Sequence, residues 1–131
     1  SAGYHLTWFE DPIHVDVNKV KNTIDWYWNG SLSSNYTAGY YYWWLSETGW
    51  KKSASDFDHG YADKRKIAFS NSYVHYKNTI FCATSDTDVW YDRNRVRGYY
   101  NGVLWGTCEW RKAGKCSGML HVHYELKRTL N

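Results

Sequence analysis

The dipeptide Asn101-Gly102 is the sequence feature that most constrains how this chain can fold. It separates two short runs of strand-forming residues, 95–100 and 103–105. A two-residue hairpin turn needs a positive φ angle at both central positions, and Asn followed by Gly adopts that conformation at little cost. We therefore expect an antiparallel hairpin in which Tyr100 lies opposite Val103.

A second turn is indicated by the small and basic residues of the segment 111–115. If the chain folds back symmetrically about Lys112, Cys108 falls opposite Cys116, at the cross-strand distance that a disulfide requires. The sequence holds 3 cysteines in all. It therefore predicts a disulfide between Cys108 and Cys116, with Cys82 left free.

The segment 119–127 alternates between apolar and polar residues, with the period of a half-buried strand. A weaker alternation over 65–77 predicts another long strand. The last strand is expected to turn Leu120, Val122, Tyr124 and Leu126 to the core and His121, His123 and Glu125 to solvent.

The segment 16–29 is the best candidate for a helix. Asp16 is suited to cap its first turn, and Asn29-Gly30 is suited to end it. The apolar residues between them recur at intervals of three and four, as on one face of a helix. They are Val17, Val20, Ile24 and Tyr27.

The remaining segments complete the expected fold. Residues 31–38 read as a loop, and the aromatic run 39–45 favours a strand, with a short helix ending at Gly49 as the alternative. Residues 51–64 are polar and indicate an extended loop or a weak edge strand. A chain of 131 residues without a linker or repeat predicts a single domain over 1–131. The expected class is α+β, an N-terminal helix followed by an antiparallel β-meander.

Aromatic residues are more numerous than a core of this size needs. The chain contains 13 Tyr and 9 Trp but only 1 Met. Tyr and Trp carry an apolar ring and a polar group, so they suit binding surfaces as well as cores. Tyr100 and Trp105 share one face of the expected hairpin and are the candidate stacking pair, with Trp43, Trp44 and Trp50 as further candidates. The alternative is that these rings fill the core in place of Leu and Ile.

Three arginines, Arg93, Arg95 and Arg97, recur at the strand period and would form one row of guanidinium groups. Such a row can bind phosphate or carboxylate groups. The structural alternative is a charged edge strand that resists aggregation. The net charge of +3 permits an anionic partner without requiring one. We therefore add Arg95 and Arg97 to the candidate ligand-binding residues Tyr100 and Trp105.

Two histidines share the predicted outer face of the last strand, and three histidines together could hold zinc or copper. No Cys-x-x-Cys or His-Glu-x-x-His motif accompanies them, so we expect no metal and no cofactor. With a nearby carboxylate, the same side chains would supply an acid and a base for phosphodiester cleavage. If the protein is an enzyme, its catalytic residues are expected to be His121, His123, His75 and Glu125.

These features favour a secreted, non-enzymatic binding protein. The expected partner is a polysaccharide, a cell-wall polymer or another extracellular macromolecule, and nucleic acid is a further partner class. An antimicrobial or defence role would fit such a protein. The alternative function is that of a small secreted hydrolase with nuclease-like chemistry. No apolar run approaches the roughly 18 residues that a membrane span requires, so we expect none.

Overall fold

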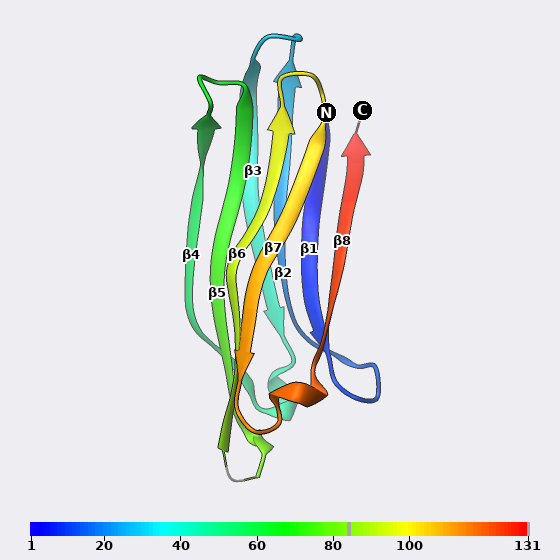
Figure 1. Cartoon of the computed structure of the whole chain (residues 1–131), viewed down its shortest axis with the longest axis vertical. Helices are drawn as coiled ribbons and strands as arrows, with labels where there is room; N and C mark the ends of the chain where they lie inside the picture. The colour runs from blue at the N-terminus through cyan, green and yellow to red at the C-terminus, as the bar shows by residue number, and fades with distance from the viewer. Residues whose placement is uncertain (84, 131) are drawn as a thin grey trace.

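The computed structural model describes residues 1–83 and 85–130, and it is built almost entirely of β-strands (Figure 1). Eight strands form two antiparallel sheets of four strands each, packed face to face. Sheet A has the strand order β3-β2-β1-β8, and sheet B has the order β4-β5-β6-β7. The strands are β1 (Ala2–Glu10), β2 (Asp16–Trp28), β3 (Ser33–Trp44), β4 (Trp50–Ala62), β5 (Ile67–Cys82), β6 (Ser85–Tyr99), β7 (Leu104–Ala113) and β8 (His121–Leu130).

The predicted N-terminal helix over 16–29 is wrong, because this segment is strand β2. Its core face alternates with period two but carries polar residues at two positions, Asn18 and Asn22, between the apolar ones. Those two asparagines conceal the strand period in the sequence. Over the residues described, helical structure amounts to two short 3₁₀ turns, η1 (Ser46–Thr48) and η2 (Ser117–Met119). The fold is therefore all-β rather than α+β.

Several strand predictions are confirmed. The aromatic run 39–45 lies in β3 up to Trp44, 65–77 lies largely in β5, and 119–127 lies largely in β8. The polar segment 51–64 belongs mostly to β4, the edge strand of sheet B. The predicted loop over 31–38 is mostly wrong, because β3 already begins at Ser33. None of the described helical turns is long and apolar enough to cross a membrane.

The hairpin at Asn101-Gly102 is confirmed, but its register differs by one residue from the prediction. The Tyr99 N–H donates to the Val103 carbonyl at 2.9 Å, and the Gly102 N–H donates to the Tyr99 carbonyl at 3.0 Å. Gly102 has a φ of +83°, whereas Asn101 is not in the positive-φ region. A three-residue loop of this kind combines a tight turn with a glycine bulge. Tyr100 therefore lies in the turn and not opposite Val103.

The predicted Cys108–Cys116 disulfide is also wrong. The disulfide joins Cys82 to Cys116, with 5.7 Å between their Cα atoms, and Cys108 is free. The symmetric fold about Lys112 fails because β7 pairs with β6 whereas β8 pairs with β1. The chain crosses from one sheet to the other between these strands, so Cys108 lies opposite Asn94 instead.

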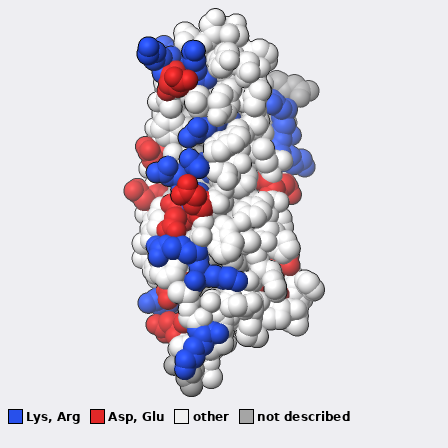
Figure 2. Space-filling view, in the orientation of Figure 1, with Lys and Arg blue, Asp and Glu red and all other residues white. Residues whose placement is uncertain are grey.

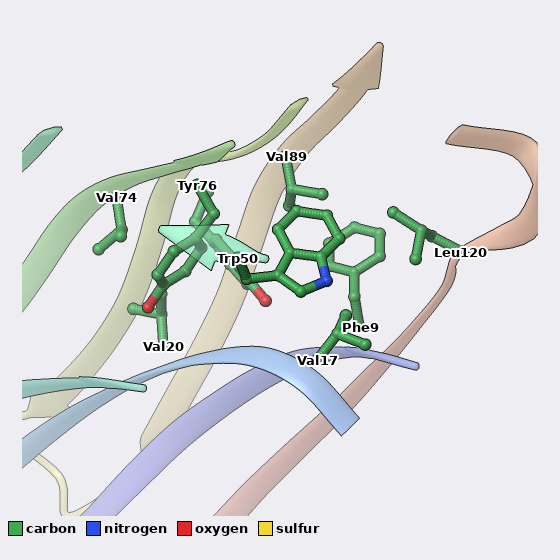
Figure 3. Close-up of a cluster of buried hydrophobic side chains, with 9 residues drawn as sticks. Phe9, Val17, Val20, Trp50, Val74, Tyr76, Val89 and Leu120 are labelled. Atoms are coloured by element: carbon green, nitrogen blue, oxygen red, sulfur yellow. The ribbon is translucent and has the colours of Figure 1, made fainter. Parts of the chain in front are cut away.

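The core between the sheets consists of two apolar clusters. The larger cluster has nine buried residues, which come from both sheets and include Phe9, Trp50 and Tyr76 (Figure 3). The smaller has four, Ile24, Trp26, Ala68 and Val96. Trp26 packs on Gly98, where an added Cβ would lie 2.2 Å from its ring. Aromatic residues thus supply much of the buried volume, in agreement with the alternative that these rings fill the core in place of Leu and Ile.

A layer of buried polar side chains lies between the strands of the two sheets. We call it the polar layer, and it comprises His5, Thr7, Asn22, Ser70, Ser72 and Asn94. Asn94 connects the sheets, because its Nδ2 donates to the His5 carbonyl at 2.9 Å and its Oδ1 accepts from the Thr7 hydroxyl at 2.9 Å. Such groups are tolerated in a core because they satisfy one another.

Candidate functional site: the outer faces of the two sheets

The outer face of sheet B brings together three of the four predicted ligand-binding residues. Arg97 on β6 lies directly opposite Trp105 on β7, and Arg95 lies diagonally across from it. The central carbons of the Arg97 and Arg95 guanidinium groups lie 4.8 and 5.1 Å from the Trp105 ring centroid. Both contacts fall within the range of cation–π attraction. We call these three residues the arginine–tryptophan cluster.

The two guanidinium groups of this cluster differ in how they are paired. Nη2 of Arg95 lies 3.3 Å from a Glu109 carboxylate oxygen. Desolvation by burial lowers the pKa of Arg95, an effect that Glu109 partly offsets. Arg97 makes no salt bridge to any residue that the structure describes, and the Nε atoms of both arginines are buried without a hydrogen-bond partner. These Nε atoms are enclosed, so an anion that approaches from solvent would have to bind the terminal Nη donors of Arg97, which no carboxylate of the described residues neutralises.

An acidic crevice lies farther along the same face of sheet B. It has a volume of about 180 Å³, and its lining includes Asp56, Asp58, Asp92 and Arg93. Figure 2 views the molecule from this side and shows charged side chains of both signs interspersed along the face. The positive potential of the arginine–tryptophan cluster is therefore local and does not extend along the whole sheet.

Tyr100, the fourth predicted ligand-binding residue, does not join the cluster. It lies in the turn before β7, where Nζ of Lys66 approaches its ring centroid to 5.7 Å. The one-residue change of register places Trp105 opposite Arg97 rather than beside Tyr100. The predicted stacking pair of Tyr100 and Trp105 is therefore not formed.

His75 lies on sheet B as well, where its ring stacks on Trp90 at a centroid distance of 4.7 Å. Its Nε2 lies 2.7 Å from Oδ1 of Asp88. The Arg111 guanidinium also contacts Trp90, at 4.2 Å from the ring centroid, and its Nε lies 2.8 Å from Asp92 Oδ2. His75 is thus held by an aromatic ring and a carboxylate of its own sheet.

The other predicted acid–base residues belong to β8, in sheet A. His121, His123 and Glu125 pair with the outward-facing residues of β1 and lie on the outer face of sheet A. The predicted core face is only partly correct, because Leu120 is buried whereas Tyr124 and Leu126 are 50% and 45% exposed. The His123 ring stacks on Trp8 at 5.3 Å, and its Nε2 lies 3.1 Å from Glu10 Oε2. The candidate catalytic set is therefore divided between two sheets, since His75 lies in the other one.

Glu125 accepts a hydrogen bond from the Tyr4 hydroxyl, and this bond raises the pKa of Tyr4. Within 1–83 and 85–130, no three His, Cys, Asp or Glu side chains are grouped so that they could hold a metal ion. The arrangement around β8 therefore consists of pairwise contacts between side chains of β1 and β8.

The outer face of sheet A carries a second group of aromatic and basic residues, which is not among the sites expected from the sequence. Lys19 and Lys21 on β2 lie opposite Trp43 and Tyr41 on β3. Each pair recurs with the strand period, Lys-x-Lys and Tyr-x-Trp, and that signal is present in the sequence. It is hidden when 16–29 is taken as a helix, because a helix would turn the two lysines to different sides.

No protein-family model, curated protein or solved structure matches this chain in comparisons with known proteins.

Proposed function

We propose that the protein is a non-enzymatic binding protein whose ligand is an anionic polysaccharide, bound at the arginine–tryptophan cluster. The observation that carries this proposal is the Arg97 guanidinium, which is held against Trp105 and has no acidic partner among the described residues. A carboxylate, sulfate or phosphate group would accept hydrogen bonds from Arg97 and Arg95 together. Hydrogen bonds between a guanidinium and an anion are among the stronger ones in proteins.

The surroundings of the cluster favour a glycan over a nucleic acid. Nucleic-acid binding rests on an extended positive surface that follows a continuous phosphate backbone. Here Asp56 and Asp58 line a crevice on the same face and would repel such a backbone. A polysaccharide with charged groups at intervals can reach the cluster without this penalty.

The distribution of the acid–base residues favours binding over hydrolysis. General acid–base catalysis requires its groups within hydrogen-bond reach of one reacting centre. His75 contacts Trp90 and Asp88 in sheet B, whereas His123 contacts Trp8 and Glu10 in sheet A. A single substrate bond would not reach both sets.

The proposed setting of this binding protein is extracellular. The disulfide between Cys82 and Cys116 is compatible with an oxidising compartment, where such bonds form and persist. Binding to cell-wall material would be a route to the antimicrobial or defence role expected from the sequence.

The test is binding to hyaluronan, in which every second sugar carries a carboxylate, to uncharged dextran and to single-stranded RNA at 50 and 300 mM salt. Arg97→Gln should weaken hyaluronan binding about tenfold or more, because a charged hydrogen bond is lost. Arg97→Lys should bind more tightly than Arg97→Gln but more weakly than the wild type, because lysine keeps the positive charge and lacks the paired N–H donors of the planar guanidinium. Higher salt should weaken binding of the wild-type protein.

The matched control is Arg111→Gln. Arg111 also lies over a tryptophan of sheet B, but Asp92 already neutralises it, so this substitution should leave binding nearly unchanged. Equal affinity of wild type and Arg97→Gln would contradict the proposal. Tighter, Arg97-dependent binding of RNA would assign the cluster to nucleic acid, and cleavage of either polymer would favour the hydrolase.

A further inference from the structure

We propose that the outer face of sheet A is a second binding site, which takes a chain of uncharged sugar rings. It lies on the opposite side of the sandwich from the arginine–tryptophan cluster and does not depend on that cluster's function. We call this site the lysine–aromatic groove, and its central residues are Leu6, Lys19, Lys21, Tyr41 and Trp43.

Strand register brings these residues into rows across the sheet. Trp8, Lys19 and Trp43 lie side by side on β1, β2 and β3. The next same-face row contains Leu6, Lys21 and Tyr41, and the one after it contains Tyr4, Thr23 and Gly39. The intervening residues of β2, such as Val20 and Asn22, are buried between the sheets. The rows therefore belong to the face that is not covered by sheet B.

The groove is elongated along the strands. One cavity of about 270 Å³ is lined by the five central residues together with Tyr42. A neighbouring cavity of about 380 Å³ is lined in part by Tyr4, Thr23, Asp25 and Thr37. Lys21 lines both cavities, so they adjoin. From Trp43 to Thr37 the groove follows seven residues of β3, a length of roughly 20 Å by the rise of a strand.

Two exposed rings stand at one side of this groove. Tyr41 is 59% exposed and Trp43 is 43% exposed, although both belong to a sheet with a packed inner face. They are successive same-face residues of β3, which places them about 7 Å apart. Because β3 is the edge strand of sheet A, no further strand of that sheet shields their outer side. Successive sugar rings could stack on them through their C–H faces.

The lysines between the rings are held in place, and Lys21 makes no salt bridge to any residue that the structure describes. Nζ of Lys19 lies 5.3 Å from the Trp43 ring centroid, and Nζ of Lys21 lies 5.2 Å from the Tyr4 and Tyr41 ring centroids. Cation–π contacts of this kind fix an ammonium group without using its N–H donors. Both lysines line the groove, so the donors that Asp16 does not occupy are available there to sugar hydroxyl groups.

Charge balance distinguishes this groove from the arginine–tryptophan cluster and points to an uncharged ligand. Nζ of Lys19 lies 2.8 Å from an Asp16 carboxylate oxygen, and Asp25 lines the second cavity, two same-face positions beyond Lys21 on β2. An uncharged glycan combines apolar ring faces with hydroxyl groups, which matches alternating aromatic, lysine, threonine and aspartate side chains.

Gly39 keeps the floor of the groove low in the third row. A Cβ at this position would lie 2.9 Å from Thr23 Oγ1 and 3.6 Å from the Tyr41 ring. Gly39→Val would therefore add bulk within the groove while leaving every ring and lysine in the sequence. It offers a way to block the site without removing any proposed contact.

The experiment measures retention on insoluble chitin and cellulose, and binding of soluble chitohexaose and cellohexaose. We expect the wild-type protein to bind at least one of these probes. Trp43→Ala and Tyr41→Ala should each weaken that binding about tenfold, by analogy with other aromatic stacking sites. Gly39→Val should weaken it as well, and 500 mM salt should have little effect on the wild type.

Two control variants show whether binding depends on this groove in particular. Tyr27→Ala removes an equally exposed tyrosine of β2, 64% exposed, that does not line the groove, and it should bind as the wild type does. Arg97→Gln should also bind normally, so that failure of the proposed function and failure of this inference remain distinguishable. Thermal unfolding of each variant verifies that it is folded.

Three results would overturn the inference. One is that the folded wild type binds none of the four probes. Another is that Trp43→Ala, Tyr41→Ala and Gly39→Val are folded and still bind the probe as the wild type does, or that Arg97→Gln no longer binds it. The third is concentration-dependent dimerisation in sedimentation that Trp43→Ala abolishes, which would make the groove a self-association surface.

Discussion

Asn94 and Asn22 meet between the two sheets, where Nδ2 of Asn94 donates a hydrogen bond to Oδ1 of Asn22 at 3.0 Å. Asn22 belongs to β2 and Asn94 to β6, so this bond joins the central strands of opposite sheets. Nδ2 of Asn22 in turn donates a hydrogen bond to the Ser70 hydroxyl at 3.1 Å. The pair therefore forms the centre of the polar layer.

Replacing Asn94 with Ala should destabilise the protein by at least about 2 kcal/mol, because several buried polar groups would lose their partner. Urea unfolding of Asn94→Ala, Asn22→Ala and the double variant measures the effect. The double variant should lose less than the sum of the single losses, since the two side chains share one network. Strictly additive losses would show that the amides act independently. Exposed Ser53→Ala is the control and should change stability by less than about 0.5 kcal/mol.

Acid should destabilise the protein through His5. Burial lowers the pKa of His5 from its ordinary 6.5, an effect that the hydrogen bond to Asn94 partly offsets. The unfolded chain therefore binds a proton at a higher pH than the folded one. The stability contributed by neutral His5 is complete above pH 6.5 and is lost as the pH falls through the lowered pKa.

Urea unfolding between pH 8 and pH 5 tests the role of His5. His5→Gln should show a shallower loss of stability with acid than the wild type. The control is His121→Gln, because the His121 side chain is exposed and its loss should leave the pH dependence nearly unchanged. Parallel curves for wild type and His5→Gln would assign the acid sensitivity to other groups.

Reduction of the disulfide should lower the free energy of unfolding by about 3–4 kcal/mol, from the loop-closure entropy of the unfolded chain. The bond closes a loop between residues 34 positions apart in the sequence. Peptide mapping without reduction should recover a Cys82–Cys116 peptide. Recovery of a Cys108–Cys116 peptide would instead restore the hairpin predicted about Lys112.

Cys108 should resist alkylation in the folded protein. Burial raises the pKa of its thiol to about 12, so very little thiolate exists at pH 8. Iodoacetamide at pH 8 should label Cys108 only after urea unfolding, as measured by the mass of the intact chain. Rapid labelling of the native protein would mean that the space between β7 and β8 admits the reagent.

Gly102→Ala should destabilise the protein by about 1–2 kcal/mol, since a side chain at positive φ is strained. The added Cβ would also lie 2.6 Å from the Trp28 ring. Gly118→Ala is a matched control, because its Cβ would meet no atom within 4 Å. We therefore expect a lower melting temperature for Gly102→Ala than for Gly118→Ala. Equal melting temperatures for the two variants would contradict the assigned turn.

Local signals in the sequence predicted several strands and the hairpin at Asn101-Gly102, because these depend on residues close together in the chain. The helix prediction failed because buried Asn18 and Asn22 interrupt the apolar alternation of β2. A buried polar residue is accommodated only by partners on other strands, such as Asn94 and Ser70 for Asn22. A single segment does not reveal those partners.

The candidate site was predictable where it depends on one strand. Arg95 and Arg97 recur with the strand period, and they do share a face. Pairing Trp105 with Tyr100 failed because a one-residue difference in turn length moves every partner across the hairpin. The prediction of a Cys108–Cys116 disulfide failed because the chain changes sheets between β7 and β8, and nothing in the local sequence indicates that change.

The polar layer also implies that the two ends of the sandwich open unequally. The end near Trp26 is held by four buried apolar residues, whereas the end that carries the disulfide is held by nine. A local opening breaks only the contacts of the part that opens. Backbone amides of Ile24 and Trp26 would therefore exchange with deuterated solvent sooner than those of Val74 and Tyr76. The sandwich would fray from the Asn101-Gly102 turn toward its middle, where the hydrogen-bonded asparagines halt the opening.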